Sequence, residues 1–188
     1  MMNTRNKIIV GLLGFGIVLF AVTQFWVLPE MDKKEQQYEM AQKDPVTHDV
    51  QSVLKYKHPY MGNAGNLTQL FSELPLNEYS RTYELDSDLL QLTILYKDGV
   101  VDIGQEKVER ALIYNATTAF ALINNLEVIR FSFHDKTYVV KRARLMSRYD
   151  TTISPRIDKE DWKLQVQEPL NQKEYVEEIM NEVFKIES

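Results

Sequence analysis

The chain has 188 residues, 44% of them hydrophobic and 26% charged, which predicts one modest globular domain with an appendage. Its net charge of −5 argues against a nucleic-acid-binding protein. The absence of cysteine excludes disulfides, thiol nucleophiles and zinc thiolate sites, and it leaves the compartment open.

A segment near the N-terminus predicts a membrane anchor. Residues 8–28 carry no charge, and at about 1.5 Å per residue they match the hydrocarbon core of a bilayer. Basic residues precede the segment and acidic residues follow it, so the positive-inside rule places residues 1–7 in the cytoplasm and the C-terminal part outside. The alternative is a cleaved signal peptide. We expect an uncleaved single-pass anchor in the cell membrane, because the bulky residues 23–26 stand where a signal protease needs small ones.

The rest of the chain divides into a stalk and a domain. Residues 29–47 are polar without an apolar period, which predicts a stalk that is either helical or flexible. Residues 48–188 then predict an extracytoplasmic α+β domain. Within it, residues 50–56 indicate a short helical piece, and residues 151–155 a loop.

Two helix-then-hairpin units follow one another in the domain. The first helix has an apolar face from Leu67 to Leu74, with Asn66 at the expected N-cap and Pro75 ending it. Alternating residues predict a hairpin over 79–96.

A longer amphipathic helix over 105–124 precedes a second hairpin over 129–141. Residues 162–166 alternate and indicate a last strand, and a capping box at Asn171 begins a final helix. The pattern predicts a two-layer domain in which helices pack on an antiparallel sheet built from the two hairpins.

The turn over residues 58–66 is the first candidate site. Its small residues run into a helix, as in loops that bind phosphate with backbone amides. It lacks the G-x-x-x-x-G-K-[ST] pattern, so the ordinary start of a helix is the favoured interpretation and anion binding the alternative. Tyr60, Gly62 and Asn63 are the residues of this possible binding surface.

A basic cluster is the second candidate, formed by Lys141, Arg142, Arg144 and Arg148. Such a cluster binds an acidic envelope polymer, lipid headgroups or the carboxylates of a partner. The alternative is a solvated strand edge whose charges prevent edge-to-edge pairing.

Motifs for catalysis or metal binding are missing from the sequence. The three histidines, His48, His58 and His134, are far apart, and none has a partner at metal-ligand spacing. No G-x-S-x-G or S-x-x-K motif occurs. We therefore expect no enzyme activity, no cofactor and no bound metal.

Three short segments occur in an order that resembles a known family. They are YKHPYMGN at 56–63, LPLNEY at 74–79 and TAFALINN at 118–125, with a hydrophobic strand at Ile129 after them. Together they resemble the domain of unknown function 4825, over about residues 50–150. The family pattern often has an acidic residue where this chain has Asn63. The resemblance implies an exported or membrane-anchored protein of a Gram-positive bacterium, and it implies no reaction.

These observations predict a membrane-anchored binding or sensory accessory module outside the cytoplasm. Its expected partner is another envelope or membrane protein, or a cell-wall component, and not a nucleic acid. Two alternatives stay open. One is an envelope enzyme with an unrecognised site, and the other is a structural subunit that assembles with itself through the final helix.

Overall fold

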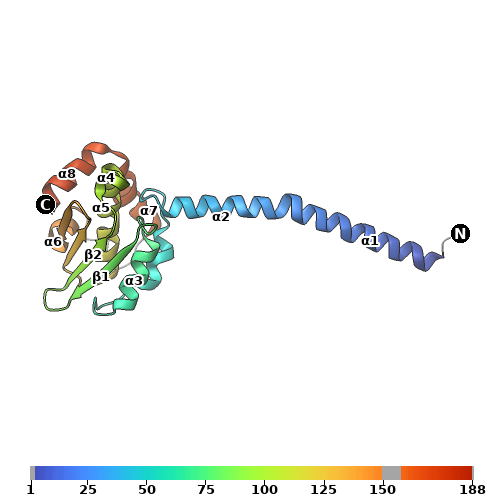
Figure 1. Cartoon of the computed structure of the whole chain (residues 1–188), viewed down its shortest axis with the longest axis horizontal. Helices are drawn as coiled ribbons and strands as arrows, with labels where there is room; N and C mark the ends of the chain where they lie inside the picture. The colour runs from blue at the N-terminus through green and yellow to red at the C-terminus, as the bar shows by residue number, and fades with distance from the viewer. Residues whose placement is uncertain (1–2, 150–157, 188) are drawn as a thin grey trace. The chain divides into compact units, whose positions relative to one another are not determined.

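The computed structural model of the chain describes residues 3–149 and 158–187, so the loop expected at 151–155 lies outside the described residues. The chain forms two compact units, Met1–Met40 and Ala41–Ser188 (Figure 1).

The first unit is helical throughout its described length. Helix α1 (Thr4–Val22) continues through a π-helical turn, η1 (Thr23–Val27), into α2 (Leu28–Gln42). The large apolar side chains between Leu12 and Leu28 are exposed, so they have no protein core to pack against. The helix is long and apolar enough to cross a membrane, properties that a signal sequence near an N-terminus shares.

The second unit holds a five-stranded sheet and its helices. The strands are β1 (Arg81–Asp86), β2 (Gln91–Tyr96), β3 (Val128–Ser132), β4 (Thr137–Lys141) and β5 (Phe184–Glu187). The helical elements are η2 (Val50–Tyr56), α3 (Ala64–Glu73), α4 (Val100–Ile103), α5 (Gln105–Leu122), α6 (Arg142–Met146), α7 (Lys159–Trp162), η4 (Lys163–Gln167), η5 (Glu168–Asn171) and α8 (Lys173–Val183).

The sheet is mixed, which corrects the expectation of an antiparallel sheet made of two hairpins. Both hairpins form, with β1 antiparallel to β2 and β3 antiparallel to β4. They join through a parallel pair, β2 and β3, because α5 carries the chain back to the starting edge between them. A fifth strand, β5, extends the sheet beside β4.

One face of the sheet is buried and the other is open, which confirms the α+β class. The buried side chains alternate along the three middle strands; they are Leu92, Ile94, Tyr96, Ile129, Phe131, Tyr138 and Val140. The intervening residues are half-buried or exposed, as in a sheet with one solvated face. Helix α5 packs into the core so completely that every residue from Ala111 to Leu122 is buried.

The C-terminal part differs from the sequence prediction. Residues 162–166, expected to alternate as a strand, are helical in α7 and η4, and they bury Trp162 and Val166. An alternating apolar pattern this short cannot be told from a buried helix by periodicity alone. The final helix α8 ends at Val183, and the chain then becomes β5, which places Ile186 on a strand and half exposed.

Two arginines bind the backbone carbonyls at corners of the fold. Arg142 donates to the Phe120 and Leu126 oxygens, each at 2.6 Å, and to the Ile123 oxygen, so it satisfies the end of α5. Burial lowers the pKa of Arg142, and the nearby Glu127 opposes that change.

Arg81 does the same for the turn that follows α3. It donates to the oxygens of Phe71, Asn77 and Tyr79 at 2.7, 2.9 and 3.0 Å. The turn contains Leu76, a buried residue in the left-handed region with φ of 69°, a conformation that costs a non-glycine residue about 1 kcal/mol. The Arg81 guanidinium thus fixes a strained corner.

Replacing Arg142 tests this role directly. Arg142→Met keeps much of the apolar stem but removes every donor, which leaves partly buried carbonyls without partners. We expect the free energy of unfolding to fall by about 3 kcal/mol. Urea unfolding of the full chain in detergent measures it, with Arg144→Met, at an exposed position, as the control. Equal stability of the two variants would contradict the capping role.

Candidate functional site

The turn at 58–66 is a structural helix start in the part of the chain that the structure describes. Asn63, not Asn66, caps α3, because its side-chain oxygen accepts from the Asn66 amide at 3.1 Å. The Met61 amide donates to the Asn125 side chain at 2.6 Å, and His58 forms a parallel bridge with Ile123. The turn is therefore bonded to the end of α5.

The other two residues proposed for this surface lie in the open. The Tyr60 side chain is 66% exposed, and Gly62 has no atom within 4 Å of the place where a Cβ would stand. Neither residue lines the two cavities of the domain that are described below. The geometry thus supports a helix start more than an anion cradle.

The structure separates the four residues of the basic cluster. Arg142 turns inward to the carbonyls of α5, as described above. Arg148 pairs with Glu178 and Glu182 of α8. Lys141 and Arg144 are exposed and form no ion pair with any described residue, which leaves a weaker cationic surface than the sequence suggested.

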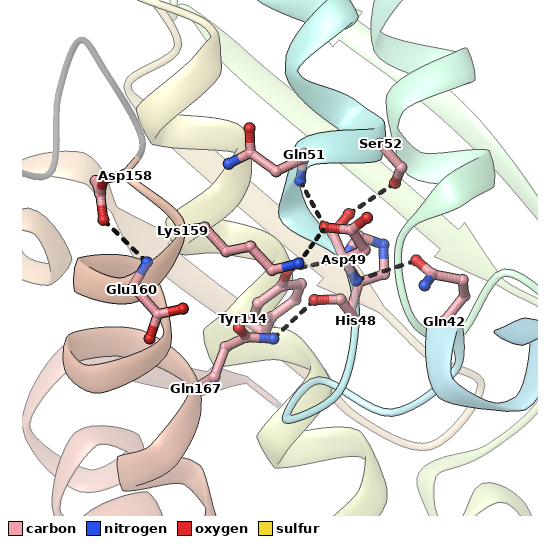
Figure 2. Close-up of polar contacts among 10 residues, drawn as sticks. All are labelled: Gln42, His48, Asp49, Gln51, Ser52, Tyr114, Asp158, Lys159, Glu160 and Gln167. Carbon is pink, nitrogen blue, oxygen red and sulfur yellow. Dashed lines mark hydrogen bonds and ion pairs between the residues drawn. The ribbon is translucent and has the colours of Figure 1, made fainter.

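A different constellation surrounds the segment that leads into the domain. We call residues 41–49, together with the side chains that bind them, the joint (Figure 2). His48 is 2% exposed and lies against Tyr114 of α5, with Nδ1 2.8 Å from the tyrosine oxygen. Its Nε2 lies 3.0 Å from the Glu73 carbonyl oxygen at the end of α3. One imidazole therefore connects the joint to two helices, α3 and α5.

The hydrogen bonds of His48 define its neutral tautomer. A carbonyl oxygen only accepts, so Nε2 carries the proton, and Nδ1 then accepts from the Tyr114 hydroxyl. Burial lowers the pKa of His48, against smaller opposing effects of Glu73 and Asp49. Burial likewise raises the pKa of Tyr114. Both side chains are held uncharged at neutral pH.

The remaining contacts of the joint come from the C-terminal part of the chain. The Gln167 amide nitrogen donates to the backbone oxygens of Pro45 and His48, each at 2.9 Å. Lys159 also lies beside Asp49 (Figure 2), and its Nζ is 3.9 Å from Asp49 Oδ1. Helical residues after position 158 therefore also hold the segment.

Two adjoining cavities lie beside the joint, and we call them together the Arg110 groove. Their volumes are about 390 and 440 Å³, and both are lined by Gln105, Glu106 and Arg110. The first extends to Leu170 and Val176, and the second to residues 43–45 of the joint.

The charges around the groove balance. Four lining residues are cationic: Lys43, Lys107, Arg110 and Lys173. Four are acidic: Asp44, Glu106, Glu109 and Glu177. The groove therefore offers both signs of charge within a small volume.

Arg110 is poorly satisfied for an arginine with little exposure. Its side chain is 22% exposed, and its one ion pair is to Asp44, with Nη2 3.2 Å from Oδ1. That oxygen also accepts from the Val46 amide at 2.9 Å. The Nε of Arg110 is buried and has no acceptor among the described residues. A guanidinium has five N–H donors, so this one retains capacity to bind an anion.

No local pattern in the sequence predicts the joint or the groove. Arg110 lies on a helix whose apolar stripe marked only the core, and His48 stood alone in the sequence. The one available signal was the position of His48 at the stalk–domain boundary, since a histidine there has to be either solvated or paired on folding.

The described residues show what chemistry the groove can support. Its lining contains no serine, threonine, histidine or tyrosine that could act as a nucleophile or imidazole base. Within residues 3–149 and 158–187, no three histidine or carboxylate side chains gather as they do around a metal. The arrangement suits ion pairing and hydrogen bonding to a ligand.

A family model described as domain of unknown function DUF4825 matches residues 53–152. The chain belongs to this family. The match confirms the resemblance seen in the segments at 56–63, 74–79 and 118–125. No curated protein matches the chain, and no solved structure does. Arg110 and Tyr114 lie within the residues that match DUF4825, whereas Asp44 and His48 precede the matched residues.

The lowered pKa of His48 predicts a pH dependence of stability. Below about pH 6.5, the histidine binds a proton in the unfolded chain but not in the folded one. The free energy of unfolding therefore decreases as the pH is lowered. The stability that neutral His48 contributes is fully present above the unfolded pKa of about 6.5, and it is lost as the pH falls to the pKa of the folded state. We expect His48→Phe to show a flatter decline than wild type between neutral and mildly acid pH.

Thermal unfolding of the full chain in detergent at a series of pH values measures the effect. His134→Phe is the control, because His134 is exposed in the β3–β4 turn. An identical pH profile for wild type and His48→Phe would show that His48 makes no such contribution.

Proposed function

We propose that the chain is a membrane-anchored binding or sensory accessory module of the bacterial envelope. Residues 8–28 form the anchor, residues 1–7 lie in the cytoplasm, and the DUF4825 domain works outside. The domain binds an envelope component, either another membrane protein or a cell-wall component, in the Arg110 groove.

The contact between Arg110 and Asp44 carries this proposal. Arg110 lines the groove, and Asp44 belongs to the segment that continues the chain from the apolar helix. A ligand anion that pairs with Arg110 competes directly with Asp44, whose side chain is 48% exposed. Binding in the groove is thus coupled to the joint, which is what a sensory role requires.

The two alternatives have less support from the geometry. An enzyme needs reactive groups in an accessible cavity, and the buried His48 and Tyr114 line neither cavity of the groove. Self-assembly through α8 has to bring together exposed acidic residues, among them Glu174 and Glu177. Like charges in such a contact repel one another.

The topology can be tested because the chain has no cysteine. In intact cells, we expect a membrane-impermeant maleimide to label Glu84→Cys, at an exposed position on β1, and not Asn3→Cys. After lysis both variants should react. Labelling of Asn3→Cys in intact cells would reverse the topology, and loss of Asn3→Cys from the mature chain would show a cleaved signal.

Partner capture tests the binding role. A photo-crosslinking amino acid at Asn171, which is exposed in the lining of the groove, should capture a reproducible envelope component in cells. The same residue at Glu84 is the matched control, because Glu84 lies on the open face of the sheet, away from the helices. Mass spectrometry identifies the product. Equal products from both positions, or none from Asn171, would contradict binding in the groove.

A further inference from the structure

The chemistry of the Arg110 groove points to a class of ligand. We propose that it binds a small zwitterion, an amino acid or short peptide end with a free carboxylate and a free amino group. This inference rests on the proposed function, because it names what the same groove recognises.

Arg110 supplies the site for the carboxylate. Two other partly buried arginines, Arg81 and Arg142, use their donors on several backbone carbonyls. Arg110 has one ion pair, to Asp44, and a buried Nε without an acceptor. Asp44 engages only Nη2 of the guanidinium, so a planar carboxylate can pair with its Nη donors.

Glu106 supplies the site for the amino group. It lines both cavities and is exposed, and it forms no ion pair with any described residue. Glu109, one turn further along α5, is held by Gln105 at 2.8 Å. The unpaired Glu106 carboxylate and the Arg110 guanidinium, which has donors to spare, are together complementary to a ligand with one positive and one negative charge.

The balance of charge argues against other ligands of similar size. A polyphosphate or an acidic polymer needs an excess of cations, whereas the groove has four charges of each sign. Leu170 and Val176 add an apolar wall that can contact a small side chain. Cavities of about 390 and 440 Å³ fall in the usual range for small-molecule sites.

Trialanine and two derivatives form a direct test of this class. We expect the full chain in detergent to bind trialanine saturably in ligand-observed NMR. The C-terminal amide lacks the carboxylate and the N-acetyl derivative lacks the amine, so each should bind about tenfold more weakly or worse. Absence of saturable trialanine binding in the millimolar range, or equal binding of all three, would overturn the proposal.

Variants assign the two ends of the ligand. Arg110→Gln should weaken trialanine at least about tenfold, and Arg110→Lys should restore only part of that loss because it cannot bind bidentately. Arg144→Gln is the control for general loss of positive charge. Unchanged binding by Arg110→Gln would exclude the carboxylate site.

Glu106→Gln gives a readout that a folding defect cannot imitate. It should weaken trialanine but leave the N-acetyl derivative unaffected, since only the former has an amine to pair. Equal weakening of both peptides would contradict the assignment of Glu106. If every peptide fails while the photo-crosslinker at Asn171 still captures a partner, the ligand class is wrong and the binding role stands.

Discussion

The burial of α5 on all sides is the constraint on which the rest of the domain depends. Every residue from Ala111 to Leu122 is buried, so each polar group on this helix needs a partner inside the protein. Asn115 donates to the Pro75 oxygen at 2.8 Å, and Thr117 lies 3.2 Å from the Tyr149 hydroxyl. These polar contacts join α5 to segments that are distant in the sequence.

The local elements of the fold could be predicted, but their arrangement could not. Alternation along β1 to β4 and the apolar stripe of α5 gave the two hairpins and the helix between them. The parallel pairing of β2 with β3 depends on how α5 crosses the sheet, and no local pattern encodes that choice. Strand β5 has only four residues and directly follows α8, so its short apolar pattern fits a continuation of the helix equally well.

The candidate site was harder to predict because nearness in sequence was misleading. Lys141 to Arg148 looked like one basic surface, yet the strand-to-helix turn sends Arg142 into the core and brings Arg148 to α8. Arg110 is the opposite case, a residue with no site signal in the sequence that the fold places in a groove. It belonged to an ordinary helix face, and only the approach of residues 43–45 and of η5 gives it a groove.

Arg110 and Tyr114 of α5 connect the groove to the joint. Arg110 and Tyr114 are four residues apart, so they share one face of the helix. Arg110 holds Asp44 and Tyr114 holds His48, which means that this single face binds both ends of a five-residue stretch of the joint. A ligand carboxylate at Arg110 competes with the Arg110–Asp44 contact, and protonation of His48 weakens its contact with Tyr114. Because α5 is too well packed to shift easily, either event changes the segment rather than the helix.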